Sequence, residues 1–408
     1  MNTRTIQRDR SGHPVGYSIA VLLSLSLTHF FNDSFQSLVS ASYPVIKEGL
    51  SLSFGQIGLV ALTYQVCASV FQPVFGLLFD RYPASWYLLA GTASTTIGLL
   101  SLSLAGSLYP VMIAVAFIGL GSSIIHPEAS RLTHLASGGR HGLAQSIFQV
   151  GGNLGGSIGP LLAAAVIATR GQRYIAIFAG IAVIAMLTKG KIIKWQRGMD
   201  QRARREKKKI PVARQTGMTK KKIYFTLALL LVLIFSKYVY TASLVNFYTF
   251  YLIEKFDVST RQSQVFLFAY LFATALGTLL GGPVGDRVGR ARVIQASIIG
   301  AVPFALLMPH AGLAGTCVLS ILVGLVLSSA FPAILVHAQE LLPDKLGLIS
   351  GLFFGLAFGI AGIAAAVLGN VADAWGIERV YELCAYMPLL GLAALFLPGR
   401  RQGKRDLT

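Results

Sequence analysis

The sequence predicts an all-α integral membrane protein of twelve transmembrane helices, arranged as two pseudo-symmetric six-helix bundles. Three observations support this fold class: the composition, the number of long apolar segments and an internal repeat. Apolar residues make up 54% of the 408 positions, charged residues make up 12%, and the mean hydropathy is +0.64. Because soluble domains carry about 25% charged residues, this composition excludes a soluble globular protein.

Apolar segments of the length needed to cross a bilayer recur along the whole chain. A hydrocarbon core about 30 Å thick requires about 20 helical residues. The first segment is too long and too rich in polar residues for a cleaved signal sequence, so we expect it to remain as a transmembrane helix. The twelve predicted spans cover residues 17–45, 54–79, 86–106, 109–135, 141–168, 174–194, 222–252, 262–285, 291–310, 313–340, 346–373 and 379–397.

The positions of the basic residues predict the topology. A net charge of +19 would suit a nucleic-acid-binding protein, but Lys and Arg gather just outside the apolar segments, so no nucleic-acid partner is expected. The two tails and the even-numbered loops hold 28 of the 35 Lys and Arg residues, whereas the odd-numbered loops hold 6. Because positive residues stay on the cytoplasmic side, both termini are expected there.

A basic segment separates two halves of the chain. Residues 189–222 contain fourteen basic and two acidic side chains, and we expect them to lie against the anionic lipids of the cytoplasmic leaflet. The predicted organisation is a cytoplasmic tail at 1–16, a six-helix bundle at 17–194, a basic linker at 195–221, a second bundle at 222–397 and a cytoplasmic tail at 398–408.

An internal repeat supports this division. The sequence GLLFDR at residues 76–81 returns as GPVGDR at residues 282–287, displaced by 206 positions, and Pro127 returns as Pro332, displaced by 205. Membrane transporters are commonly built from two such repeats. Helices 1 to 6 are therefore expected to correspond to helices 7 to 12 around a central cavity.

The second copy of this repeat resembles the loop signature of the major facilitator superfamily, G-x-x-x-D-R-x-G-R. The resemblance implies a cytoplasmic latch, in which the carboxylate faces a helix N-terminus and the arginines pair with acids such as Glu340. The alternative is that the arginines only set the topology. The first copy, Asp80 and Arg81, departs from the signature after the arginine, so its latch is expected to be weaker or to have different partners. Arg131 is a further candidate for the latch. The matching residues of the second copy are Gly282, Asp286, Arg287, Gly289 and Arg290.

Two helices carry ladders of small residues. The fifth span resembles the glycine-rich antiporter motif of drug-exporting facilitators at Gly155, Gly159 and Pro160, and the eleventh span contains Gly355 and Gly359. Small residues allow helix backbones to approach closely, so plain helix packing is an equally good interpretation.

Longer stretches resemble a bacterial drug-resistance group within the same superfamily. The resemblance is closest at 137–153 and extends over most of the chain, including 29–36, 126–131 and 339–343. It implies a monomeric, proton-coupled drug exporter of the bacterial inner membrane. Composition and spacing by themselves imply only a facilitator with twelve helices.

Ionisable residues inside the predicted spans are few, and they are candidates for function because their burial in lipid is unfavourable. Asp33 belongs to a polar stripe along the first helix and is the first candidate for proton exchange, followed by Glu128, His29 and His126. Two alternatives remain open. The stripe could be a hydrogen-bonded seam between helices, and Glu128 could form a structural ion pair with Arg131, three residues later.

Lys237 is the leading candidate for substrate binding. It lies about 22 Å along the helix from the start of the seventh span, near the midplane of the membrane. A cation there needs an acid such as Asp33, a water-filled cavity or an anionic substrate. Further candidates share polar side chains on helices that should face the cavity: Gln36, Tyr64, Gln145, Gln149, Asn153, Tyr240 and Tyr248.

No catalytic or metal-ligand spacing is visible in the sequence. The three cysteines lie inside apolar segments, and the histidines are scattered over several helices. We therefore expect no enzyme activity, metal or cofactor. The predicted function is proton-coupled export of a small amphiphilic or anionic antibiotic, and the alternative is proton-coupled transport of an organic-anion metabolite or siderophore. A non-transporting sensor would need a signalling domain, which the basic linker is too short to supply.

Overall fold

The computed structural model describes residues 18–52, 54–205 and 218–398. The predicted N-terminal tail, the linker segment 206–217 and residues 399–408 of the C-terminal tail lie outside the described residues. Eleven helices in the described part of the chain are long and apolar enough to cross a membrane. The first helix, α1 (Ile19–Ala41), corresponds to the first predicted span and is the one predicted span that is not among these eleven. Its polar side chains lower its hydropathy.

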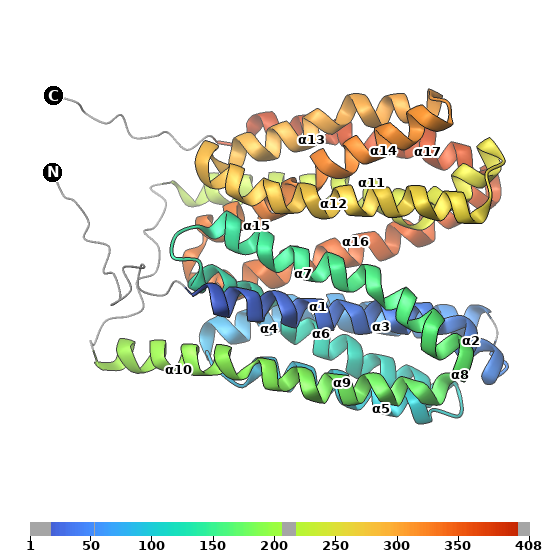
Figure 1. Cartoon of the computed structure of the whole chain (residues 1–408). Coiled ribbons are helices and arrows are strands. Elements are labelled where there is room, and N and C mark those ends of the chain that lie inside the picture. The colour runs from blue at the N-terminus through green and yellow to red at the C-terminus, as the bar shows by residue number, and fades with distance from the viewer. Residues whose placement is uncertain (1–17, 53, 206–217, 399–408) are drawn as a thin grey trace, which may run out of the picture. The chain divides into compact units, whose positions relative to one another are not determined.

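The helices follow one another through the chain with short connections (Figure 1). After α1 they are α2 (Tyr43–Gly49), α3 (Phe54–Ser69), α4 (Phe71–Arg81), α5 (Tyr87–Leu104), α6 (Leu108–Ala136), α7 (His141–Leu162), η1 (Ala163–Ile167), α8 (Ala168–Arg170), η2 (Gln172–Tyr174), α9 (Ile175–Thr188), α10 (Gly190–Arg205), α11 (Lys220–Phe256), α12 (Thr260–Val288), α13 (Arg290–Leu307), η3 (Met308–His310), α14 (Leu313–Ser328), α15 (Ala330–Leu341), η4 (Pro343–Lys345), α16 (Leu346–Trp375), α17 (Ile377–Ala385) and η5 (Met387–Phe396).

Two predicted spans are interrupted, one in each half of the chain. The second span is divided into α3 and α4, and the tenth into α14 and α15. Pro73 and Pro332 lack the amide hydrogens that would bond the carbonyls of Ser69 and Ser328, the last residues of α3 and α14. A missing backbone donor therefore accompanies both breaks. The helical structure that follows α9 also continues past the predicted span, because α10 reaches Arg205.

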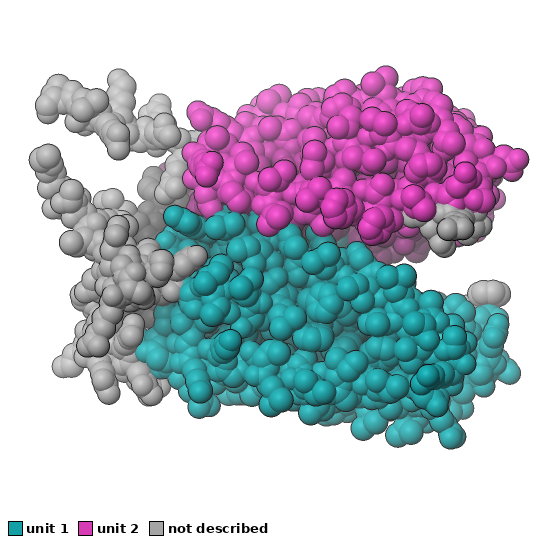
Figure 2. Space-filling model, viewed as in Figure 1, with its two compact units in different colours: residues 1–214, 342–359 teal, residues 215–341, 360–408 magenta. Residues whose placement is uncertain are grey.

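The chain forms two compact units (Figure 2). One unit contains residues 1–214 together with 342–359, and the other contains residues 215–341 together with 360–408. The boundary near residue 214 falls within the predicted linker. The first half of α16 belongs to the first unit, although it lies late in the sequence.

The helix pairs within each unit follow the repeat. In the first unit α1 packs along α7, α3 packs on α6, and α5 packs on α6 and α9. In the second unit α12 packs on α14, and α13 packs on α14 and η5. The helices α3, α5, α6 and α9 lie in spans 2, 3, 4 and 6, and α12, α13, α14 and η5 lie in the corresponding spans 8, 9, 10 and 12. The three contacts α3–α6, α5–α6 and α5–α9 thus recur as α12–α14, α13–α14 and α13–η5.

Apolar side chains from five of these helices form the core of the first unit. Phe35 of α1, Val60 of α3, Leu99 of α5, Ile118 of α6 and Phe178 of α9 are all buried in one cluster. This core holds α1 and α6 in fixed positions, and those helices carry most of the ionisable candidates.

Glycines bring α7 unusually close to α1. A Cβ atom at Gly155 would lie within 3.0 Å of the Phe30 backbone, and one at Gly159 would lie 2.6 Å from the amide nitrogen of Leu38. Pro160 lies inside α7, shortly before the helix changes to the π-helical segment η1. In α16, a Cβ at Gly355 would lie 2.5 Å from the carbonyl oxygen of Ser69, whereas one at Gly359 would be 3.8 Å from the same residue. These distances support helix packing as the role of Gly155, Gly159 and Gly355.

We expect Gly155→Ala to destabilise the protein by about 1–3 kcal/mol, because the added methyl group overlaps the α1 backbone. Gly156→Ala is the matched control, since no atom lies within 4 Å of a Cβ atom at that position. It should be neutral or stabilise by less than about 1 kcal/mol. Thermal unfolding in detergent measures both variants, and equal melting temperatures would contradict the proposed close contact.

Candidate functional site

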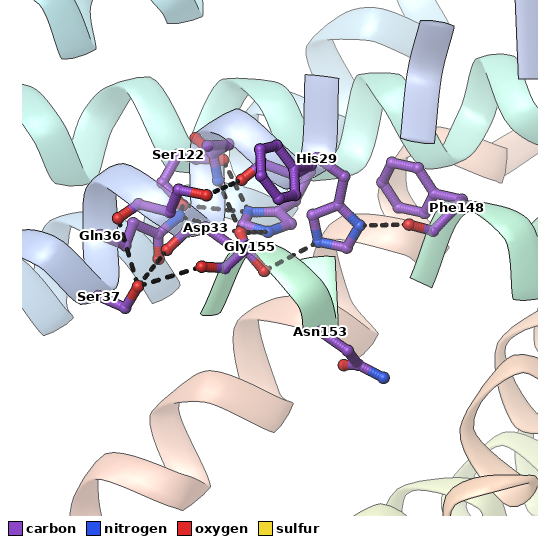
Figure 3. A network of polar contacts seen from close by, with 12 residues as sticks. His29, Asp33, Gln36, Ser37, Ser122, Phe148, Asn153 and Gly155 are labelled. Carbon is purple, nitrogen blue, oxygen red and sulfur yellow. Dashed lines mark hydrogen bonds and ion pairs between the residues drawn. The ribbon is translucent and has the colours of Figure 1, made fainter. Parts of the chain in front are cut away.

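The carboxylate of Asp33 lies between two buried histidine rings (Figure 3). His29, one turn earlier on α1, places Nε2 3.2 Å from Asp33 Oδ2, and His126 on α6 places Nε2 3.2 Å from Asp33 Oδ1. Asn32 donates a further hydrogen bond to Oδ1 at 3.0 Å. The structure therefore brings together three of the four predicted proton-coupling residues.

The hydrogen bonds on the far side of the His29 ring fix where its proton lies. His29 Nδ1 is 2.8 Å from the carbonyl oxygen of Phe148, which only accepts hydrogen bonds, so this Nδ1 carries a hydrogen and the Nε2 lone pair of a neutral His29 faces the carboxylate. His126 Nδ1 is 3.1 Å from both the carbonyl oxygen and the hydroxyl of Ser122, and its Nε2 is 3.2 Å from Asp33 Oδ1. When the Ser122 hydroxyl donates to Nδ1, a neutral His126 carries its hydrogen on Nε2 and donates it to Asp33.

Aromatic side chains enclose this group. The His29 ring stacks on Phe148 with centroids 4.1 Å apart, and His126 lies 5.2 Å from Phe354 and 5.0 Å from Phe358. The two histidine side chains are 2% and 0% exposed, whereas that of Asp33 is 17% exposed. Access to the cluster is therefore through the carboxylate.

Gln36 extends the network along α1. Its Nε2 donates to Ser122 Oγ at 2.8 Å, and its Oε1 accepts from the hydroxyl of Tyr64. The polar stripe of α1 thus bonds to α3 and α6, as the seam interpretation expected, while Asp33 keeps a partly exposed side chain. Gln36 therefore takes part in a hydrogen-bonded seam between helices, and a cavity lined by Asp33 stays a prediction.

The polar residues of α7 do not all join this network. Gln145 accepts a hydrogen bond from Ser130 Oγ at 3.3 Å. Gln145 Nε2 and Gln149 Oε1 are buried without a hydrogen-bond partner among the described residues. Asn153 lies beside the cluster with its side chain directed away from Asp33 (Figure 3).

Glu128 forms a two-pronged ion pair with Arg131. Both carboxylate oxygens lie 2.8 Å from guanidinium nitrogens, and both residues are buried. This geometry favours the structural alternative for Glu128, because a bidentate bond to arginine holds a carboxylate ionised.

Asp80 caps the start of α16. Its Oδ1 accepts a hydrogen bond from the amide of Gly347, and its Oδ2 accepts one from the amide of Leu348, each at 2.8 Å. The neighbouring Arg81 lies over the ring of Tyr82, 5.4 Å from its centroid. The incomplete first copy of the signature therefore makes the contact with a helix N-terminus that the sequence analysis expected of the complete copy.

The complete copy forms an ion-pair cluster in the second unit. Arg290 pairs with Asp286 at 2.7 Å and with Glu340 at 3.2 Å. Gly289 ends α12 with φ of 100°, a backbone conformation that favours glycine. Gly282 is buried in α12, and Arg287 is exposed. The predicted pairing of Arg290 with Glu340 is present, whereas none of the ion pairs among the described residues includes Arg287.

Lys237 is a buried cation surrounded by aromatic rings. It is 7% exposed, and its Nζ lies 4.8 Å from the ring centroid of Tyr238 and 5.3 Å from that of Phe331. None of the ion pairs found within the described ranges involves Lys237. Cation–π contacts stabilise its charge only in part.

The predicted tyrosines occupy the core of the second unit. Tyr240 is buried, and its hydroxyl has no hydrogen-bond partner among the described side chains and backbone. Tyr248 is also buried and donates to Ser320 Oγ at 2.9 Å. Of the two hydroxyls, that of Tyr240 is the better candidate for a ligand contact.

Sequence reasoning did not identify the residues that build the walls of the Asp33 cluster. Phe148 supplies both a stacking ring and a carbonyl acceptor, and Phe354 comes from the other half of the sequence. Gly152 lies against the cluster, where a Cβ atom would be 2.8 Å from Asp33 Oδ2. Apolar residues in apolar helices carry no signal of such a role.

The fold and these buried charges define a membrane transport protein. The family model of the Major Facilitator Superfamily matches residues 25–256 and 229–408, so the chain belongs to this superfamily of transporters and is not an enzyme. The predicted fold class and family are confirmed.

The fucose:proton symporter FucP of E. coli, in a mutant form, aligns over 93% of this chain and 99% of its own with a TM-score of 0.72 and 14% identity. A structure of FucP in the outward conformation aligns over 94% of this chain and 99% of its own, with a TM-score of 0.74 and 15% identity. These alignments show the shared fold.

Two curated relatives are much closer in sequence. The fosmidomycin resistance protein of Escherichia coli K12 is 50% identical over 384 residues, which cover 94% of each chain. An uncharacterised transporter of the same superfamily from Bacillus subtilis 168, YfnC, is 39% identical over 379 residues, which cover 93% of this chain and 92% of the relative. The protein is a multi-pass membrane transporter, and the resemblance noted in its sequence extends over nearly the whole chain.

Proposed function

We propose that the protein exports a small anionic or amphiphilic drug of the fosmidomycin type in exchange for protons. The relative that is 50% identical is named for resistance to fosmidomycin, which supports the choice of drug. The observation that carries the proposal is the Asp33 carboxylate held between two imidazole Nε2 atoms. This arrangement takes up a proton inside a transmembrane region, where one is needed for coupling.

The proton changes the energy of the cluster directly. Without it, the Nε2 lone pair of His29 opposes the negative charge of Asp33. A proton on this Nε2 converts the repulsion into a charge-assisted hydrogen bond. Enclosure by Phe148 and Phe354 strengthens this interaction, whereas entry of water weakens it. Opening to either side of the membrane would thereby change the affinity for a proton.

Lys237 supplies the complementary charge for the substrate. A buried lysine without an acidic partner gains stability when an anion binds beside it. The Tyr238 and Phe331 rings next to its Nζ provide apolar surface for the rest of an amphiphilic molecule. Other groups for substrate contacts are the buried unpartnered atoms Tyr240 Oη and Gln149 Oε1.

The topology and the latch belong to the same proposal. The distribution of Lys and Arg supports a topology with both termini in the cytoplasm. A monomer in the bacterial inner membrane is part of the proposal through the resemblance to bacterial drug exporters. The Asp80 cap and the Asp286, Arg290 and Glu340 cluster would stabilise one of the states that alternate during transport. The two predicted bundles, 17–194 and 222–397, would be the parts that move.

Transport driven by a pH gradient tests the function. Inverted membrane vesicles with an acidic interior should accumulate radiolabelled fosmidomycin when they contain the protein, and dissipating the gradient should stop accumulation. Vesicles without the protein are the control. Equal accumulation with and without the gradient would contradict exchange for protons.

An organic-anion metabolite or siderophore remains the alternative substrate, because Lys237 would attract any anion. Counterflow distinguishes the two. Vesicles loaded with unlabelled fosmidomycin should take up the labelled drug faster than empty vesicles. Counterflow by a metabolite anion, without counterflow by the drug, would favour the alternative.

A further inference from the structure

We infer that Asp33, His29 and His126 form a binding site for one divalent transition-metal ion of the Zn²⁺ class, which occupies the place of the proton. One ligand atom from each of these residues lies within 4.8 Å of the others. The inference rests on this geometry and not on the proposed drug export. It departs from the expectation of no metal site.

The distances are close to those between ligands of a single ion. Zinc binds imidazole nitrogen and carboxylate oxygen at about 2.0–2.2 Å, so tetrahedral ligands stand about 3.3–3.5 Å apart. His29 Nε2 lies 3.2 Å from Asp33 Oδ2 and His126 Nε2 lies 3.2 Å from Asp33 Oδ1, so each ring is at ligand distance from one oxygen of the same carboxylate. The approach of His29 Nε2 does not have hydrogen-bond geometry, because this buried atom has no hydrogen-bond partner among the described residues.

The partners of the two rings are those of metal-binding histidines. A histidine that binds a metal through Nε2 usually donates its Nδ1 hydrogen to a carbonyl or carboxylate, which fixes the ring orientation. The carbonyls of Phe148 and Ser122 accept these hydrogens from His29 and His126. The lone pair of His29 Nε2 is therefore directed at the position between the ligands before any ion arrives, and that of His126 Nε2 takes the same direction once the hydrogen is on Nδ1 and bonded to the Ser122 carbonyl.

The site also has a route for the ion and a free coordination position. Asp33 is the exposed member, so an ion would enter over its carboxylate. Gly152 packs directly against His29 and Asp33, where a Cβ atom would be 2.8 Å from Oδ2, so a larger residue there would displace the ligands. Three protein ligands leave a fourth tetrahedral position, which water or an anion could fill.

Metal binding to the full-length protein in detergent tests this inference, without drug or gradient. Calorimetry with Zn²⁺ should show one ion per chain, and Co²⁺ should give the intense visible absorption of a four-coordinate ion. His29→Gln, His126→Gln and Asp33→Asn should each weaken binding by at least about 10-fold. His134→Gln is the matched control, because His134 is a buried histidine on α6 outside the cluster.

A second variant keeps all three ligand residues and displaces two of them, because a Cβ atom at Gly152 would overlap the His29 ring and lie 2.8 Å from Asp33 Oδ2. Gly152→Ala should weaken Zn²⁺ binding, and Gly156→Ala, on the open side of α7, should not. Size-exclusion profiles and melting temperatures identify variants that fail to fold. Full-affinity binding in folded His29→Gln and His126→Gln, loss of binding in His134→Gln, or no binding to the parent protein would each overturn the inference. A failure of drug export would leave these measurements unaffected.

Discussion

In Asp33→Asn, accumulation of drug driven by a pH gradient is expected to fall by at least about 10-fold, while gradient-free exchange of labelled for unlabelled drug continues. The amide resembles the protonated acid in shape but cannot release a proton, and it removes charge-assisted hydrogen bonds worth about 1.5–3 kcal/mol each. Transport then loses its driving force without losing its substrate site. Both rates are measured in the same inverted vesicles.

Two further carboxylates make this result specific. Asp373→Asn changes an exposed acid of α16 and should transport like the parent protein. Glu128→Gln is expected to lower the amount of folded protein, because it breaks the buried pair with Arg131. Undiminished gradient-driven accumulation in Asp33→Asn would remove this carboxylate from coupling, and loss confined to Glu128→Gln in folded protein would transfer the role to Glu128.

Replacing Lys237 with methionine should weaken binding of an anionic drug by about 10- to 100-fold, because a bond between two charged groups is lost. Methionine keeps most of the unbranched apolar stem, so packing against Tyr238 and Phe331 is largely retained. A neutral drug carried by the same protein should lose much less affinity. Equilibrium binding in detergent gives both values.

A second buried lysine provides the control. Lys189 is 1% exposed, and its Nζ donates to the carbonyl oxygen of Ala185 at 3.3 Å. Lys189→Met removes a buried charge elsewhere in the chain and should leave drug affinity unchanged. If Lys237→Met reduced the affinity for anionic and neutral drugs equally, the lysine would have a structural role.

Much of the fold could be predicted from the sequence because hydropathy, charge distribution and repeats are properties of the chain itself. The polar residues of α1 made this helix a candidate for function, because polar side chains are unfavourable in lipid. The same side chains lower the hydropathy of the helix. The interruptions of the second and tenth spans were not predicted, although Pro73 and Pro332 mark both places. A proline signals a missing donor, but whether a helix bends or breaks there depends on packing.

The site could be predicted only as a set of residue types. Asp33, His29 and His126 were identified separately, but His29 and His126 stand 97 positions apart, so no spacing rule joins them. Their partners are backbone carbonyls and phenylalanine rings, which any apolar helix contains. The capping role of Asp80 was also underestimated, because it depends on the amides of Gly347 and Leu348, far away in the sequence.

The bonds between α1 and α7 have a consequence for how the protein is made. Ser26 Oγ donates to the carbonyl of Ile147, and His29 bonds to that of Phe148, so these polar groups find partners about 120 residues later in the chain. At about 5–20 residues per second, the ribosome needs about 6–24 s to supply them. During this interval the first helix has exposed polar groups and a low hydropathy. The first helix therefore lacks its α7 partners until the fifth span has been synthesised.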